Sequence, residues 1–266
     1  MKSCDLCPKR CGCDRSAGHC GVCRNTDAPR IYQHFLHFGE EITIVPAFII
    51  NMAGCNLHCP TCPERCRFEQ TPLAVGTPEH YARAMAGYFR RTQMPKSIEW
   101  IGGEPSTQIL FVLETSWVLK SILSPCPPIY LNTNAYFDAE LLDMMAGAID
   151  SFVFDLKCVD ACAPNIVMAD DYWQQATTVI RKAAEIFENP GIIRHLVMPG
   201  HVECCTSPIL DWCRRYVPEM TFNLMTTFQD FRSKHSGPDH LPDSDKSLAI
   251  RMLEESGLRH CMIDGK

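Results

Sequence analysis

Residues 97–123 read SIEWIGGEPSTQILFVLETSWVLKSIL, and they contain the repeating unit from which the fold is built. The short run Ser97–Ile101 predicts a buried strand, and Gln108–Leu123 has the apolar pattern of a helix. The glycine-containing turn Gly102-Gly103-Glu104-Pro105 lies between them. This stretch therefore predicts a strand, a turn at its carboxyl end and a helix.

The same alternation recurs along most of the chain. Five more strands are predicted at Ile42–Ile50, Pro128–Asn132, Ser151–Leu156, Ile192–Met198 and Thr221–Met225. Five more helices are predicted at His80–Arg91, Glu140–Ala146, Asp171–Phe187, Ser207–Tyr216 and Asp243–Ser256. Six strands that alternate with helices predict an α/β fold with a parallel sheet, either open or closed into a partial barrel. Chemistry in such folds gathers at the carboxyl ends of the strands.

Composition limits the class of partner. The 266 residues are 46% hydrophobic, which suits one full-sized domain and a small appendage. The net charge is −6, from 25 basic and 31 acidic residues, and no basic block is present. This balance argues against nucleic acid or an anionic membrane as the main partner. The chain has no long apolar run and its first residues lack a signal-peptide pattern, so we expect a cytoplasmic protein.

Seventeen cysteines are unusual for a cytoplasmic chain, where grouped cysteines bind metals more often than they form disulfides. Six of them lie between Cys4 and Cys23, in a polar segment that shows no helical or strand period. Such a segment cannot bury a core and would need a metal to become ordered. We therefore expect a metal-binding segment at residues 1–40 and the α/β domain at residues 41–266.

A second group of cysteines follows the first predicted strand. Cys55, Cys59 and Cys62 have the spacing C-x3-C-x2-C. Three thiolates can hold three irons of a [4Fe–4S] cubane and leave the fourth iron open to another ligand. The alternative is a closed site, a zinc knuckle or a four-cysteine electron-transfer cluster, with Cys66 as the fourth ligand.

Two motifs together resemble those of radical S-adenosylmethionine (SAM) enzymes. The C-x3-C-x2-C motif follows Gly54, and Gly102-Gly103-Glu104-Pro105 resembles the motif that binds the amino group of SAM. Glycines let the backbone approach a ligand, and a carboxylate complements an ammonium group. The resemblance implies a partial (β/α)6 TIM-like barrel, a [4Fe–4S] cluster on Cys55, Cys59 and Cys62, and reductive cleavage of SAM to a 5′-deoxyadenosyl radical that abstracts a substrate hydrogen.

Within that superfamily, the chain most resembles the activating enzymes of glycyl-radical enzymes, in particular the pyruvate formate-lyase activating enzyme-like group. The similarity spans nearly the whole chain and includes Asp155-Leu156-Lys157 and the Arg194…Pro199-Gly200 segment. It implies that Asp155 and Lys157 line the SAM site. Two positions depart from the pattern: Thr61 replaces an aromatic residue, and Asn132 replaces an aspartate that helps bind a cation. Asn132 and His201 complete the expected cofactor-binding residues.

The cysteine-rich leader also resembles that group, through Cys4, Cys7, Cys11 and Cys20. These four cysteines are the expected ligands of a second metal site, either an iron–sulfur cluster or zinc. Zinc could instead use the pairs Cys4-x2-Cys7 and Cys20-x2-Cys23. Cys204 and Cys205 are adjacent in sequence, and neighbouring residues rarely bind one metal, so we expect ordinary thiols there.

These observations predict an oxidoreductase, with an anaerobic setting and an electron donor such as flavodoxin or ferredoxin implied by the resemblance. The substrate could be a glycyl C–H of a partner protein, another peptide residue or a small metabolite. The competing hypothesis is a non-catalytic iron–sulfur or zinc protein that carries electrons or acts as a scaffold. That hypothesis explains the cysteines and leaves the Gly-Gly-Glu and Asp-x-Lys motifs unexplained.

Overall fold

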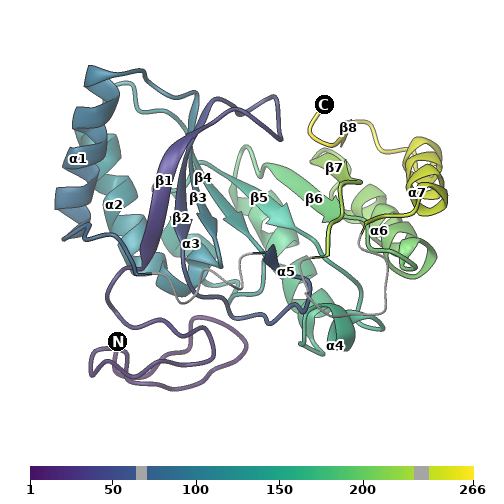
Figure 1. Ribbon diagram of the computed structural model, residues 1–266, viewed down its shortest axis with the longest axis horizontal. Helices are drawn as coiled ribbons and strands as arrows, with labels where there is room; N and C mark the ends of the chain where they lie inside the picture. The colour runs from purple at the N-terminus through teal and green to yellow at the C-terminus, as the bar shows by residue number, and fades with distance from the viewer. Residues whose placement is uncertain (64–70, 231–239) are drawn as a thin grey trace. The chain divides into compact units, whose positions relative to one another are not determined.

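The computed structural model of the protein describes residues 1–63, 71–230 and 240–266 (Figure 1). The chain forms two compact units. Unit 1 comprises Met1–Asn56, Glu64–Thr133 and Phe137–Phe152, and unit 2 comprises Leu57–Pro63, Asn134–Tyr136 and Val153–Lys266.

Unit 1 contains four strands in chain order. The strands are β1 (Ile31–His37), β2 (Ala47–Met52), β3 (Ser97–Gly102) and β4 (Ile129–Thr133). β1 is antiparallel to β2, whereas β2 and β3 are parallel, as are β3 and β4. Its helices are α1 (Pro78–Arg91), the 3-10 helix η2 (Pro105–Gln108), α2 (Ile109–Ile122) and α3 (Leu141–Met145). α1 and α2 lie side by side in Figure 1.

The core of unit 1 is aromatic. Trp100 on β3 is fully buried, and its ring lies edge-on to Phe111 of α2, with 6.2 Å between centroids. Phe48 of β2 packs in the same way on Phe89 of α1 at 4.9 Å. Edge-to-face pairs at these distances stabilise a core beyond the area that they bury. The two helices are thus fixed on the strands that carry the candidate motifs.

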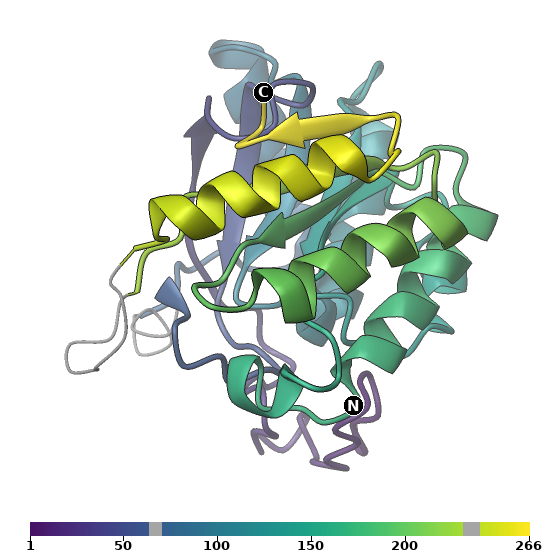
Figure 2. The ribbon, with the colours of Figure 1, turned by 90° about the vertical axis from the view of Figure 1, so that its right-hand side faces the viewer.

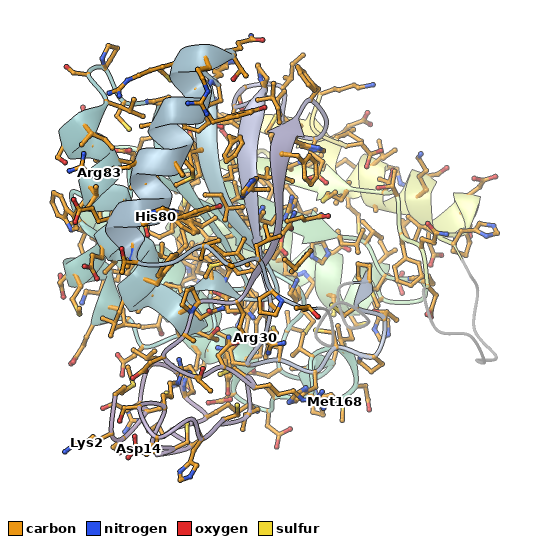
Figure 3. The ribbon with its side chains drawn as sticks, turned by 60° about the vertical axis from the view of Figure 1, so that its left-hand side comes forward. Lys2, Asp14, Arg30, His80, Arg83 and Met168 are labelled. Carbon is orange, nitrogen blue, oxygen red and sulfur yellow. The ribbon has the colours of Figure 1, made fainter. Side chains whose placement is uncertain are left out.

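The leader, residues 1–30, contains no helix or strand and is held to the remainder of unit 1 by polar side chains. Figure 3 shows Lys2 and Asp14 in its loops and Arg30 near its end. Asn25, which is fully buried, donates to the Thr107 hydroxyl at 2.8 Å. The buried Arg15 guanidinium donates to the Thr107 carbonyl and to Cys23 Sγ. The leader is therefore anchored on η2.

Unit 2 contains most of β5 and the three strands that follow it, all parallel. β5 (Ser151–Asp155), β6 (Ile192–Leu196), β7 (Thr221–Met225) and β8 (Cys261–Ile263) pair in that order. Its helical segments are α4 (Ala163–Ile166), α5 (Tyr172–Ile186), the π-helical turn η3 (Val202–Thr206), α6 (Ser207–Tyr216) and α7 (Asp243–Glu255). Figure 2 shows α6 and α7 beside each other.

The α/β class with mostly parallel strands is confirmed. The first predicted strand starts too early, because residues 41–45 form a turn in which the Ile44 N–H donates to the Glu41 carbonyl at 3.0 Å. β1, α4 and β8 were not predicted. Among the described residues, no helix is both long and apolar enough to cross a bilayer.

Candidate functional site

In unit 1, the backbone of the turn after β3 is hydrogen-bonded to the backbone at the end of β2. The Gly103 N–H donates to the Met52 carbonyl at 2.7 Å, and the Glu104 N–H donates to the Gly54 carbonyl at 2.8 Å. A Cβ atom on Gly102 would lie 2.3 Å from the Met52 oxygen, and one on Gly103 would lie 2.1 Å from the Gly54 oxygen. Only glycine allows this approach. The Gly-Gly-Glu motif is therefore bonded directly to the residue that precedes Cys55.

Glu104 is fully buried and held in one orientation. Its Oε1 accepts from the Ser106 N–H at 3.0 Å and from the Thr133 hydroxyl at 2.7 Å, and it caps the start of η2. Asn132, also buried, precedes Thr133 at the carboxyl end of β4. The structure thus brings four predicted residues of unit 1 to the ends of two paired strands: Gly102, Gly103, Glu104 and Asn132.

In unit 2, Cys59 and Cys62 lie on the loop 57–63. The Cys62 N–H donates to the Cys59 carbonyl at 3.2 Å, which forms a turn. Burial raises the pKa of the Cys59 thiol to about 11, and the positive charge of Lys157 opposes this change. Cys55 is half-buried on the unit 1 side of the motif, and these three cysteines form no disulfide. Sulfur donors with a cation beside them suit thiolate ligation of iron.

Asp155 and Lys157 form an ion-pair network with Arg194 in unit 2. Asp155 Oδ1 is 2.6 Å from Arg194 Nε, and its Oδ2 is 3.0 Å from Lys157 Nζ. Although burial opposes ionisation, the two cations hold the pKa of Asp155 well below its ordinary value, and Asp155 raises that of Lys157. The Tyr172 hydroxyl accepts from the Lys157 N–H at 3.0 Å and donates to the Asp155 carbonyl at 2.7 Å. The network fixes two charged groups at the end of β5.

The histidine within β6 and the histidine that follows this strand have different surroundings. His195 is buried, with Nδ1 2.8 Å from the Leu156 carbonyl and Nε2 3.0 Å from the Thr206 hydroxyl, and burial lowers its pKa to about 4. His201 precedes η3, and its Nδ1 is 3.3 Å from Cys204 Sγ. This grouping of His201 with cysteines was not predicted from the sequence, although the spacing His-x2-Cys-Cys could have indicated it.

The leader brings some of its cysteines together. The Sγ atoms of Cys4, Cys11 and Cys13 lie within 4.8 Å of one another. Among the described residues, that group contains neither Cys7, whose thiol bonds to Asn56, nor the exposed Cys20. Although burial alone would raise it, hydrogen bonds from Cys13 hold the pKa of Cys11 below its ordinary value.

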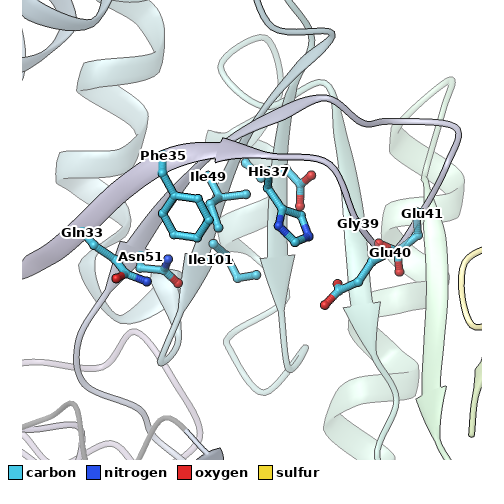
Figure 4. Close-up of a pocket in the computed structure, with 10 residues that line it drawn as sticks. Gln33, Phe35, His37, Gly39, Glu40, Glu41, Ile49, Asn51 and Ile101 are labelled. Carbon is cyan, nitrogen blue, oxygen red and sulfur yellow. The ribbon is translucent and has the colours of Figure 1, made fainter. Parts of the chain in front are cut away.

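A pocket in unit 1 lies on one face of β1, β2 and β3 (Figure 4). The polar groups of the pocket come from Gln33, His37, Asn51 and the buried Glu99, and Ile101 directly precedes Gly102 in the chain.

Cys66, the alternative fourth ligand of the cluster, lies outside the described residues.

The chain is similar in sequence to one known protein and in fold to two solved structures described here. An uncharacterized protein of Methanocaldococcus jannaschii is 28% identical over 263 residues, which cover 96% of this chain and 73% of the relative. Spore photoproduct lyase, solved with a dinucleoside spore photoproduct, is 10% identical with a TM-score of 0.57 and coverage of 88% and 80%. SuiB of Streptococcus suis, solved with its precursor peptide SuiA, is 13% identical with a TM-score of 0.56. That match covers 79% of this chain and only 46% of SuiB. These two structures share the fold.

The sequence model described as "Radical SAM superfamily" matches residues 49–213, which contain the three cysteines and both further motifs. Since that match covers more than half of the chain, the protein belongs to the radical SAM superfamily.

Proposed function

We propose that this protein cleaves SAM reductively at a [4Fe–4S] cluster and removes a hydrogen atom from a substrate. The observation that carries the proposal is the bond from Glu104 N–H to the Gly54 carbonyl at 2.8 Å. It joins the Gly-Gly-Glu motif to the residue before Cys55, which an electron carrier with a closed four-cysteine site would not require.

Cys55, Cys59 and Cys62 would hold three irons of the cluster, and bound there it would supply the electron that breaks the sulfonium bond of SAM. Glu104 and the carbonyl groups of Gly102 and Gly103 would accept hydrogen bonds from the SAM ammonium group. The rigid hold on Glu104 by Ser106 and Thr133 supports this role. Asn132, Asp155 and Lys157 would line the remainder of the SAM site.

We propose a protein or peptide residue as the substrate, with a glycyl C–H of a partner enzyme as the specific case. The resemblance to the pyruvate formate-lyase activating enzyme-like group supports this choice. SuiB, which shares the fold, has been solved with a peptide bound. The polar pocket around Asn51 and Glu99 offers hydrogen-bonding groups to such a substrate. A flavodoxin or ferredoxin would deliver the electron in an anaerobic cytoplasm.

The first test is to reconstitute the full chain anaerobically with iron and sulfide, reduce it, add SAM and quantify 5′-deoxyadenosine. Cys59→Ala should abolish the product, whereas Cys261→Ala, which removes an exposed thiol outside the motif, should leave the yield unchanged. If the reduced intact protein forms no 5′-deoxyadenosine, and SAM does not alter its EPR spectrum, the electron-carrier hypothesis replaces this proposal.

We also propose that residues 1–40 hold a second metal site, of iron–sulfur or zinc type, next to the domain 41–266. Cys4 and Cys11 belong both to the ligand set expected from the sequence and to the close group of thiols. A Cβ atom on Gly21 would lie 2.3 Å from Cys11 Sγ, so any larger residue at this position would displace that thiol. Metal analysis of Cys13→Ser and Cys20→Ser would distinguish the two ligand sets, because only the variant that lacks a ligand should lose metal.

A further inference from the structure

Unit 2 contains a second group of sulfur and nitrogen atoms, apart from the loop 57–63. The group consists of Cys162, His201, Cys204 and Cys205, whose Sγ atoms and one ring nitrogen all lie within 4.8 Å of one another. Cys162 Sγ is 3.5 Å from Cys204 Sγ, and His201 Nδ1 is 3.3 Å from Cys204 Sγ. The residues come from the segments that follow β5 and β6.

These distances agree with four ligands around a single ion. A tetrahedral zinc site has Zn–S bonds of about 2.3 Å, which place two ligand sulfurs about 3.8 Å apart. A cubane cluster would require a wider group, because each thiolate binds a different iron. A disulfide between Cys162 and Cys204 would need a sulfur separation of about 2.05 Å and would give His201 no role.

The local backbone explains how adjacent cysteines can share one site. Cys204 and Cys205 lie in the π-helical turn η3, where the Thr206 N–H donates to the His201 carbonyl at 3.4 Å. Single π-helical turns are found frequently at functional sites. The Cys205 thiol also receives a backbone hydrogen bond from Val159. Such a bond from a surrounding group orients a sulfur ligand, and here it opposes the rise in the pKa of the thiol that burial causes.

From this geometry we propose that Cys162, His201, Cys204 and Cys205 form a mononuclear zinc site that joins the segment after β5 to the segment after β6. The zinc ion would hold residues 157–162 in place, and this segment begins with Lys157. His201 is thereby a zinc ligand and not a SAM contact. This inference does not depend on SAM cleavage, and its test uses no activity measurement.

The test is site-resolved alkylation of the full chain, reduced and kept anaerobic. A brief iodoacetamide pulse followed by peptide mass spectrometry gives the labelling rate of each cysteine. Cys204 and Cys261 are both exposed, so both should react in the presence of a chelator. Addition of zinc should slow labelling of Cys204 at least tenfold and leave Cys261 unchanged. His201→Ala should lose this protection, whereas His80→Ala, at a helix surface, should keep it.

Several results would overturn the site. Equal labelling of Cys204 and Cys261 in excess zinc would show that no ion binds there. A Cys204 that is unreactive before zinc is added, and reactive only after stronger reduction, would indicate a disulfide to Cys162. Protection by iron and sulfide but not by zinc would indicate a cluster, and protection that survives His201→Ala would remove the histidine from the ligand set.

Discussion

Replacement of Gly103 by alanine should destabilise the protein by a clash between the new methyl group and main-chain atoms of Gly54. The new Cβ atom would lie 2.1 Å from the Gly54 oxygen and 2.8 Å from the Gly54 carbonyl carbon, whereas ordinary contacts begin at 3.4 Å. The two strand ends must therefore separate by roughly 1 Å. No flexible side chain is available to move aside, since the atoms in the way belong to the backbone.

Such a shift stretches two hydrogen bonds, from Gly103 to Met52 and from Glu104 to Gly54. Each contributes about 1 kcal/mol, and the overpacking itself costs about 1–3 kcal/mol. We therefore expect Gly103→Ala to lower the free energy of unfolding by about 3–5 kcal/mol. The unfolding transition in urea, followed by the fluorescence of the four tryptophans, is the direct measurement.

Gly87→Ala is the matched control. Gly87 lies within α1, and a Cβ atom there meets only the far end of the Arg91 side chain, at 3.2 Å. This change should stabilise the protein by about 0.5–1 kcal/mol, because alanine favours a helix more than glycine. The reasoning is refuted if Gly103→Ala costs less than about 1 kcal/mol while Gly87→Ala behaves as expected.

Three more changes test other parts of the structure. Asp155→Asn should lower the free energy of unfolding in urea by about 2–4 kcal/mol, because Arg194 and Lys157 lose their counter-charge. In the same assay, Glu79→Gln in the exposed pair with Arg83 should lower it by only about 0.3–0.5 kcal/mol. When the pH falls from 7 to 5.5, the wild-type protein should lose about 1.2 kcal/mol more free energy of unfolding than His195→Gln. The reason is that a histidine in the unfolded chain binds a proton near pH 6.5, whereas the folded His195 does so only near pH 4. Equal losses in thermal melts would contradict this. Arg15→Met should speed thermolysin cleavage of the leader about tenfold by leaving the buried Thr107 carbonyl without its donor, and Arg10→Met, at an exposed side chain, should not.

The parallel strands β2 to β7 and most helices could be predicted because their apolar patterns are local. Ser207–Tyr216 and Thr221–Met225 have the predicted bounds, and α1 differs only at its first two residues, where the Thr77 side chain caps the helix. β1 was missed because its aromatic and histidine side chains do not alternate cleanly between buried and exposed positions.

The part of the candidate site that could be predicted consists of residues whose type suits the chemistry and which directly follow or end a predicted strand. The placement of Gly102, Gly103, Glu104 and Asn132 at strand ends follows from the α/β alternation. The anchoring of the leader by Arg15 was not predictable, since it depends on a carbonyl group 92 residues away. The grouping of Cys162 with His201 was equally out of reach, because the two residues come from different connections and are brought together by the pairing of β5 with β6.

The bond from Glu104 to Gly54 also bears on how this chain could change length during evolution. This hydrogen bond joins the two ends of the segment that runs from Cys55 to Gly103, so these ends stay fixed whatever lies between them. The entropy of closing a longer loop rises slowly, by about 0.6 kcal/mol for each doubling of its length. Extra modules could therefore be inserted after the cysteine motif without disturbing the geometry of its base.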